Sequence, residues 1–261
     1  MTGALRARSD DDPTSRGAGQ VSALSVLLDR SGGEAAALRE VAEMLSHELR
    51  TPLTTIYSGS KILSRPGAPL SDSTVREVSA AIEVEAERLK RIIEDLVVAA
   101  LPGSRAIGAE PVLVQHILPA IVAHEQERTP DVRFVVSLSE HLPAVRGDEA
   151  YLEQVLRNLL SNAARFGPQN GVIAVTVVET RTGVRVQIAD EGPGLAEHED
   201  ERIFELFFRA PETADRGGLG LGLFVCRRLV DAMGGRIWAR SRSRGGAEFA
   251  FELPIYPSDD G

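Results

Sequence analysis

A histidine and a glutamate stand side by side at His47 and Glu48, in a segment whose apolar residues recur every three or four positions. The spacing predicts a long amphipathic helix with one apolar stripe. Its members are Leu38, Val41, Leu45, Leu49, Leu53 and Ile56. His47 is two residues from its neighbours in that stripe, so its side chain is turned about 200° away from them. The sequence therefore predicts an outward-facing imidazole beside a carboxylate, although a solvated histidine on a coiled coil would show the same pattern.

Two asparagines, Asn158 and Asn162, are four residues apart in a predicted helix that Asp148 can cap. They lie apart from the apolar stripe of that helix, which consists of Leu152, Val155, Leu156, Leu159, Leu160 and Ala163. Solvation would explain both side chains, although asparagine is a poor helix former. Amide oxygens are also suitable ligands for Mg²⁺, which in proteins often binds together with substrate phosphates. The pair is therefore a candidate metal site.

Asp190 follows a predicted strand in which apolar and polar residues alternate. The alternation places Asp190 on the buried face, at the end of the strand. A buried carboxylate needs a strong hydrogen-bond donor, and the exocyclic amine of a nucleotide base is one. Gly192, Pro193 and Gly194 then permit a tight turn and the close approach of a planar ligand. An aspartate that only begins a turn is the simpler alternative.

A glycine-rich segment, Gly217 to Leu223, leads into a predicted helix over Leu221 to Met233. Glycines at this place allow backbone N–H groups to approach phosphates at a helix N-terminus. By itself, the segment is equally explained as a flexible connection.

The elements that must position these residues fall into two parts. The helix that carries His47 is predicted from Glu34 to Leu63, kinked at Pro52, and it ends at a cluster of serine, proline and glycine. A second amphipathic helix, capped by Ser71, reaches about Ala100. Two helices joined by a short loop form an antiparallel hairpin that cannot cover its own seam. Residues 34–100 are therefore predicted to form a dimeric four-helix bundle.

The second part, residues 111–256, mixes helices and strands. Helices are predicted at 112–127, after Asp148 and at 221–233, a strand at 132–138, two strands within 172–189, and a last hairpin over 237–253. This pattern indicates an α+β sandwich in which helices cover one face of a sheet. Residues 101–110 form a linker, residues 1–33 a disordered tail with a short apolar element, and residues 257–261 a second tail.

Composition narrows the class of protein. The 261 residues are 43% hydrophobic and 26% charged, and 29 Lys and Arg against 38 Asp and Glu give a net charge of −9. That charge argues against nucleic acid as the partner, and the alternating Arg236, Arg240, Arg242 and Arg244 fit the solvated side of a strand. The single Cys226, expected to be buried, fits a reducing compartment. No run is long enough for a membrane span and no signal peptide is evident, so a cytoplasmic chain is expected. His116, His124, His141 and His198 lack metal-like spacing and are expected on the surface.

Five motifs occur in an order that resembles the sensor histidine kinases of two-component systems. The run Ser46-His47-Glu48-Leu49-Arg50-Thr51-Pro52-Leu53-Thr54 is similar to their H-box. Asn158 with Asn162, Asp190 to Gly194, Phe204 to Phe208 and Gly218 to Gly222 resemble their N, G1, F and G2 boxes. The resemblance covers residues 34–255. It implies a dimerisation and phosphotransfer hairpin followed by a Bergerat-type ATP-binding domain.

The resemblance also implies a role for each motif residue. His47 would be the phosphoacceptor, Glu48 would orient its imidazole or take its proton, and Thr51 would assist dephosphorylation of the partner. Asn162 would ligate Mg²⁺ with the help of Asn158, and Asp190 would bind the adenine amine. The residues that shape the pocket and hold the phosphates would be Gly192, Gly194, Arg165, Phe166, Gly218, Leu219, Gly220, Leu221 and Gly222, with residues 209–219 as a lid. Arg165 stands where the family often has lysine and keeps the positive charge.

The sequence thus predicts a homodimeric histidine protein kinase. It would autophosphorylate His47 from Mg-ATP and pass the phosphoryl group to an aspartate in the receiver domain of a separate response regulator, which it would also dephosphorylate. An anti-sigma-like serine kinase shares the nucleotide motifs but lacks the hairpin, and other ATPases of the same fold need further domains. A non-catalytic dimeric scaffold would be expected to lose His47, Asn162 or Asp190. The chain could be a short kinase or part of a longer one.

Overall fold

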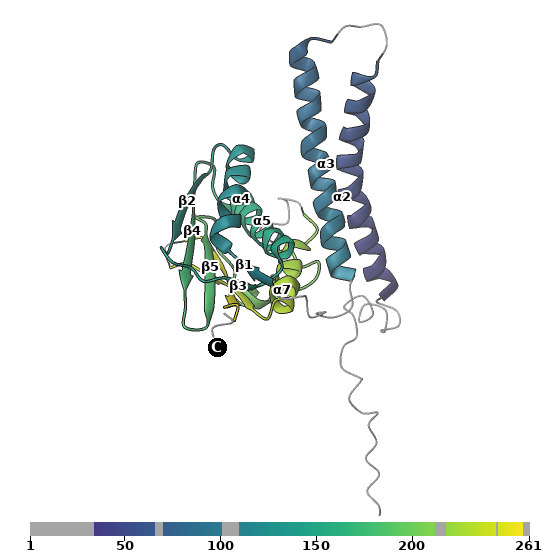
Figure 1. The fold of residues 1–261 in the computed structure, drawn as a ribbon. Coiled ribbons are helices and arrows are strands. Elements are labelled where there is room, and N and C mark those ends of the chain that lie inside the picture. Colours follow the sequence, from purple (N-terminus) through teal and green to yellow (C-terminus); the bar gives the residue numbers. More distant parts are fainter. Residues whose placement is uncertain (1–33, 66–69, 101–109, 212–217, 244, 258–261) are drawn as a thin grey trace, which may run out of the picture.

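The computed structural model describes residues 34–65, 70–100, 110–211, 218–243 and 245–257. Within these residues the chain forms a long helical hairpin followed by an α/β domain that lies beside it (Figure 1). The predicted tails, the loop at 66–69, most of the linker and residues 212–217 of the predicted lid lie outside the described residues.

Helices α2 (Glu34–Leu63) and α3 (Asp72–Ala100) form the hairpin. Both helices have the bounds that the apolar pattern predicts. Helix α2 continues through Pro52 and packs along α3 on either side of it, through Leu45 before the proline and beside Ile82 at Gly59 after it. The hydroxyl of Ser71 accepts a hydrogen bond from the N–H of Thr74 at 3.2 Å, which caps α3 as predicted.

The α/β domain is built on a five-stranded sheet with the strand order β2-β4-β5-β7-β6. Strands β2 and β4 pair in parallel, and the other neighbours pair antiparallel. The strands are β2 (Arg133–Leu138), β4 (Val172–Glu179), β5 (Gly183–Ala189), β6 (Arg236–Ser241) and β7 (Ala247–Pro254). The pair β4–β5 corresponds to the two strands predicted within 172–189 and the pair β6–β7 to the predicted last hairpin, and the mixed α+β architecture is confirmed.

Three helices cover one face of the sheet and lie between it and the hairpin (Figure 1). They are α4 (Val114–Arg128), α5 (Glu149–Phe166) and α7 (Gly222–Ala232). Helix α5 begins at its predicted cap, where Asp148 accepts a hydrogen bond from the N–H of Tyr151 at 3.1 Å. One continuous core fills the space between helices and sheet, and it includes the stripe of α5, the inward residues of the strands and Cys226.

Three small elements differ from the prediction. Helix α6 (Glu199–Arg202) is added, and β1 (Glu110–Val112) pairs with β3 (Val145–Gly147) in a separate two-stranded sheet. Strand β1 takes residues that the apolar pattern assigns to the linker and to the following helix, so α4 begins at Val114 instead of Val112. Strands of three residues are too short to show a period of two, which is why the sequence does not reveal them.

Strand β2, at the position predicted for a strand, remains largely exposed. Phe134, Val136 and Leu138 share the face toward the helices, since they pair with buried residues of β4. However, Val136 and Leu138 remain 38% and 37% exposed. The reason is that β2 is an edge strand, covered on its inner face mainly by α4.

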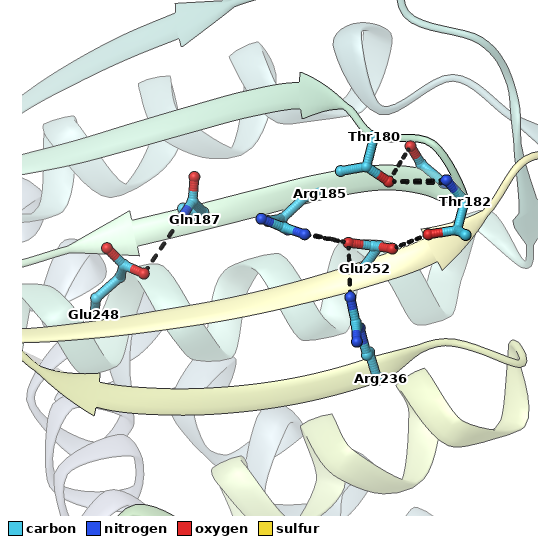
Figure 2. A network of polar contacts seen from close by, with 8 residues as sticks. Thr180, Thr182, Arg185, Gln187, Arg236, Glu248 and Glu252 are labelled. Carbon is cyan, nitrogen blue, oxygen red and sulfur yellow. Dashed lines mark hydrogen bonds and ion pairs between the residues drawn. The ribbon is translucent and has the colours of Figure 1, made fainter.

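The opposite face of the sheet carries a polar network centred on Glu252 of β7 (Figure 2). Glu252 accepts hydrogen bonds from Thr182 at 2.6 Å, from Arg185 on β5 at 2.8 Å and from Arg236 on β6 at 3.4 Å. Burial raises the pKa of Glu252, but these hydrogen bonds outweigh the effect of burial and lower the pKa to about 2. Both arginines also flank the ring of Trp238, at 5.4 and 5.2 Å. The network therefore ties three neighbouring strands together.

The surface positions predicted for four histidines are confirmed, and Arg236 and Arg240 are exposed as predicted, whereas Arg242 is half-buried and Arg244 lies outside the described residues. His116, His124, His141 and His198 are exposed. The part of the chain that is described contains no group of three or more His, Cys, Asp or Glu side chains that could hold a metal ion. In the same part, none of the helices combines the length and the apolar character that a transmembrane span requires.

Candidate functional site

A cavity of about 480 Å³ lies between the α/β domain and helix α3 of the hairpin. Its volume is within the range of small-molecule sites. The domain contributes α5, the end of β5 and the glycine-rich segment, and the hairpin contributes one face of α3 together with Glu48 of α2. The predicted residues that line it are Glu48, Asn158, Asn162, Arg165, Phe166, Asp190, Gly194, Gly218, Leu219, Gly220, Leu221 and Gly222. His47, Thr51 and Gly192 are not among its lining residues.

Asp190 is 2% exposed, on the buried face where the alternation along β5 places it. One carboxylate oxygen, Oδ1, accepts hydrogen bonds from the N–H of Gly192 at 2.8 Å and from the N–H of Ala247 at 3.1 Å. Neither of these bonds uses Oδ2. The carboxylate is therefore fixed by backbone donors on one side and retains an acceptor for a donor on a ligand in the cavity.

The glycines around Asp190 allow close packing of three chain segments. A Cβ on Gly192 would lie 2.6 Å from the carbonyl oxygen of Phe166, and Gly194 has a φ of +83°. Gly192 thus affects the cavity indirectly, because it allows the backbone of the lining residue Phe166 to lie close to it. Gly246 of the β6–β7 turn is a further requirement, because a Cβ there would collide with the carbonyl oxygen of Asp190. Nothing local in the sequence of the predicted hairpin over 237–253 indicates that its turn reaches β5.

Asn158 and Asn162 share the face of α5 that lines the cavity, as their spacing predicts. The side-chain NH₂ group of Asn158 donates to Asp95 Oδ1 on α3 at 3.2 Å and to the carbonyl oxygen of Gly222 at 3.4 Å. Two amide side chains beside a space for phosphates are a donor set that fits Mg²⁺, whose coordination is completed by waters and phosphate oxygens.

The glycine-rich segment forms one wall of the cavity. Gly218 and Gly220 have φ values of +96° and +67°, a region that favours glycine. The N–H of Phe207 donates to the carbonyl oxygen of Gly220 at 3.1 Å, which attaches the predicted F motif to this wall. Leu219 and Leu221 are 6% and 3% exposed, because they also pack against apolar side chains of the hairpin around Ala99.

Arg165 lies at the cationic end of the cavity. A Cβ on Gly218 would be 2.6 Å from its guanidinium, and the guanidinium stacks over the ring of Phe166 at 4.8 Å. Burial lowers the pKa of Arg165, and the charge of Arg88 on α3 lowers it further. A buried cation that repels a second cation favours an anion between them, so this end of the cavity suits phosphate groups.

The phosphoacceptor candidate and its neighbours lie on α2 at the edge of the cavity. His47 is exposed, whereas Glu48 turns toward the cavity and accepts a hydrogen bond from Arg88 at 2.9 Å. The hydroxyl of Thr51 donates to the backbone carbonyl of His47 at 3.3 Å, a bond common for threonine within helices. In this arrangement Glu48 contacts α3, and its carboxylate is not bonded to the imidazole.

On the hairpin side of the cavity, the sequence predicts Glu48 but none of the residues of α3. Arg88, Arg91, Ile92 and Asp95 line the cavity from α3. They lie beside the apolar stripe of α3, where charged residues are ordinary for an amphipathic helix. Their role in the cavity depends on the position of the α/β domain, which no local pattern encodes.

The chain matches known proteins over both parts of the fold. Residues 37–100 match the family model of the His Kinase A (phospho-acceptor) domain. Residues 147–257 match that of the histidine kinase-, DNA gyrase B- and HSP90-like ATPases. The chain is 34% identical over 235 residues to the adaptive-response sensory kinase SasA of Synechococcus sp. (strain CC9311), covering 88% of this chain and 59% of that protein. It therefore spans less than two thirds of this curated relative.

Solved structures agree with these matches. The catalytic domain of the histidine kinase ThkA is 30% identical, with a TM-score of 0.51, and the match covers 58% of this chain and 100% of that domain. ThkA in complex with the response regulator protein TrrA is 25% identical, with a TM-score of 0.59, covering 92% of this chain and 68% of that one. The two domain matches and the likeness in sequence and fold show that the chain belongs to the sensor histidine kinases of two-component systems.

Proposed function

We propose that this chain is a histidine protein kinase that phosphorylates its own His47 from Mg-ATP and passes the phosphoryl group to an aspartate of a response regulator. The observation that carries the proposal is the cavity itself, because it brings the nucleotide motifs of the α/β domain next to Glu48 of the helix that bears His47. Since Mg-ATP is the phosphoryl donor, the reaction takes place in the cytoplasm.

The cavity accommodates the two ends of ATP differently. The adenine amine would donate to Asp190, whose other hydrogen bonds are already fixed by the backbone. The phosphates would lie along Gly218 to Gly222, near the guanidinium of Arg165. Asn162, with Asn158 one turn earlier, would hold Mg²⁺, which neutralises charge on the transferring phosphoryl group.

His47 would attack the γ-phosphate through a neutral ring nitrogen, in line with the bond to ADP that breaks. Glu48 would orient the imidazole or accept its proton. Because His47 is exposed and does not line the cavity, the α/β domain must take another position to reach the imidazole of its own chain or of a partner. The ion pair between Glu48 and Arg88 must break in that step if Glu48 acts on His47.

A second copy of the chain is the partner that the hairpin requires. Leu53 and Tyr57 on α2 are 58% and 59% exposed, and Ile93 and Val97 on α3 are 51% and 56% exposed. Each pair is spaced by one helical turn, so it forms a continuous apolar strip. A four-helix bundle made from two hairpins would cover these strips.

The receiver domain of a response regulator is the proposed acceptor of the phosphoryl group. The known complex of ThkA with the regulator TrrA supports this, since the chain resembles ThkA over both of its parts. When bound to its own regulator, this chain would also remove the phosphate from it, with Glu48 and Thr51 near the aspartyl phosphate.

The proposal is tested by incubating the chain with Mg-ATP labelled at the γ-position. The phosphate should be stable to alkali and labile to acid, as a phosphoramidate is, and His47→Gln should abolish the labelling. His116→Gln changes another exposed histidine, on α4, and should leave labelling intact. Labelling that persists in the His47 variant, or ATP hydrolysis with no protein-bound phosphate, would contradict the proposal.

A further inference from the structure

The orientation of the Asn158 side chain is set by two acceptors. Its amide faces Asp95 Oδ1 at 3.2 Å and the carbonyl oxygen of Gly222 at 3.4 Å. Neither a carbonyl nor a carboxylate oxygen can donate, so the amide must present its NH₂ group to both. Neither of these two bonds uses the carbonyl oxygen of Asn158, Oδ1, which is thereby turned away from both acceptors.

Asp95 belongs to the hairpin, and several contacts hold it against α5. The same oxygen that meets Asn158 also accepts a hydrogen bond from Gln154 of α5 at 2.9 Å. Nearby, Arg228 of α7 donates to the carbonyl oxygen of Ala99 at 3.1 Å. Ala99 packs with Leu219 and Leu221, and these contacts fix α3 along the cavity wall.

A carboxylate that is partly removed from water loses hydration, which raises its free energy unless protein donors replace the lost hydrogen bonds. Asp95 is partly buried, and the side chains of Gln154 and Asn158 both donate hydrogen bonds to its Oδ1. The hairpin has exposed positions for acidic residues on every turn of α3, yet Asp95 lines the cavity. Its partners are the amides of α5, one of which is a candidate metal-binding side chain.

We propose that Asp95 is a positioning residue of the nucleotide site: it orients Asn158 so that the carbonyl oxygen of that side chain serves Mg-ATP. The hairpin then contributes to metal–nucleotide binding as well as to phosphoryl acceptance. This inference rests on the proposed binding of Mg-ATP. Groups that orient a metal-binding side chain typically change metal affinity by about 10- to 100-fold when they are removed.

A thermodynamic consequence is that the binding of Mg-ATP and the contact between the α/β domain and α3 strengthen each other. If contact with α3 strengthens the binding of Mg-ATP, then Mg-ATP strengthens the contact with α3 by the same factor. The chain with Mg-ATP bound would therefore hold its α/β domain against α3 more firmly than the chain with metal-free ATP.

The test compares Asp95→Ala with Asp95→Asn in the full chain. Titration calorimetry measures the dissociation constant of ATP with excess MgCl₂ and again with excess EDTA. Asp95→Ala should weaken Mg-ATP binding by about tenfold and leave metal-free ATP binding within twofold. Asp95→Asn keeps an acceptor oxygen for Asn158, so it should restore Mg-ATP binding to within about threefold of the unsubstituted chain. Glu94→Ala, a change at the neighbouring exposed acidic residue, is the matched control and should have no effect.

The other outcomes each contradict the inference. Unchanged Mg-ATP binding in Asp95→Ala, or an equal loss with and without Mg²⁺, would show that Asp95 does not act through the metal site. Tighter Mg-ATP binding in Asp95→Ala would show that the contact restrains Asn158 and inhibits the site. If Asp95→Ala does not fold, failure of Asp95→Asn to bind Mg-ATP normally would overturn the inference. Absence of any nucleotide binding by the unsubstituted chain would instead reject the proposed function.

Discussion

The α/β domain and the hairpin bury their apolar side chains to very different extents. In the domain, Leu152, Val175 and Phe251 are fully buried in one continuous core. In the hairpin, Leu53 of the predicted apolar stripe of α2 and Ile93 of α3 remain 58% and 51% exposed. The domain therefore supplies its own stability, whereas the hairpin depends on what packs against it.

The hairpin has two apolar surfaces, and only one of them is covered by the α/β domain. Around Ala99, Leu45 and Ile92, the leucines of the glycine-rich segment provide apolar contacts from the α/β domain. Around Leu53 and Ile93, no described residue of the chain provides such cover, and the proposed second copy would do so. The nucleotide site lies at the covered side, so its geometry depends on both parts of the molecule.

The largest change in stability is expected when a leucine-to-alanine substitution in the α/β domain is compared with one in the hairpin. Leu152→Ala removes a fully buried side chain of α5 and should lower the free energy of unfolding of the domain by about 2–5 kcal/mol. Leu53→Ala removes an exposed side chain and should leave the domain unchanged. Urea unfolding followed by the fluorescence of Trp238, the single tryptophan, reports on the domain because Trp238 lies on β6.

The second half of that comparison is the association of the hairpin. Leu53→Ala should weaken the dimer in sedimentation equilibrium, and Leu152→Ala should not, at temperatures where both variants are folded. Equal loss of domain stability in the two variants would show that the hairpin and the domain unfold as one cooperative unit.

A smaller effect, specific to the domain, is expected in acid. The pKa of Glu252 is about 2 in the folded chain, below its ordinary value of 4.5, so the network stabilises the domain fully above about pH 5. The stabilisation of roughly 2–3 kcal/mol should be lost as the pH falls toward 2. The unfolding free energies of the unsubstituted chain and Glu252→Gln should differ at pH 7 and converge near pH 2. A constant difference would mean that the network acts by packing and not by charge.

The sequence predicts the elements of both parts well, because their patterns are local. The apolar stripes give the bounds of α2 and α3, Asp148 marks the start of α5, and the alternation in β5 places Asp190 on the buried face. The short strands β1 and β3 are not predicted, since three residues show no period.

The sequence predicts the domain's half of the cavity and, on the hairpin, only Glu48. Most motif residues of the α/β domain line the cavity, although Gly192 does not, and the contribution of α3 through Arg88, Arg91 and Asp95 does not follow from any motif. These side chains look like ordinary charges flanking an apolar stripe. They become cavity residues only because Leu219 and Leu221 pack on the hairpin, which is a contact between segments more than a hundred residues apart.

A change within the domain's half of the cavity should weaken nucleotide binding moderately. Asp190→Asn keeps one acceptor for the N–H groups of Gly192 and Ala247, so folding should change little. The loss of charge weakens the bond to the adenine amine, and ATP affinity should fall about tenfold, or about 1.4 kcal/mol. Titration with ATP and GTP measures this. Equal affinities of the unsubstituted chain for both nucleotides would show that Asp190 does not select adenine.

The smallest effect on stability should come from Thr51 in the hairpin, yet it separates two activities. Its hydroxyl bonds to the carbonyl of His47 at 3.3 Å, at the geometric limit for such a bond, and the position is exposed, so Thr51→Ala should cost less than about 0.5 kcal/mol. One turn beyond His47, the same hydroxyl can hold a water in line with an aspartyl phosphate. Autophosphorylation and transfer should stay near normal in Thr51→Ala, while dephosphorylation of the regulator slows. Thr54→Ala, which removes the 2.7 Å bond to the carbonyl of Arg50, is the matched control for a purely structural role. If both variants lose kinase and phosphatase rates in parallel, the threonines support the helix, and the proposed phosphatase role of Thr51 is wrong.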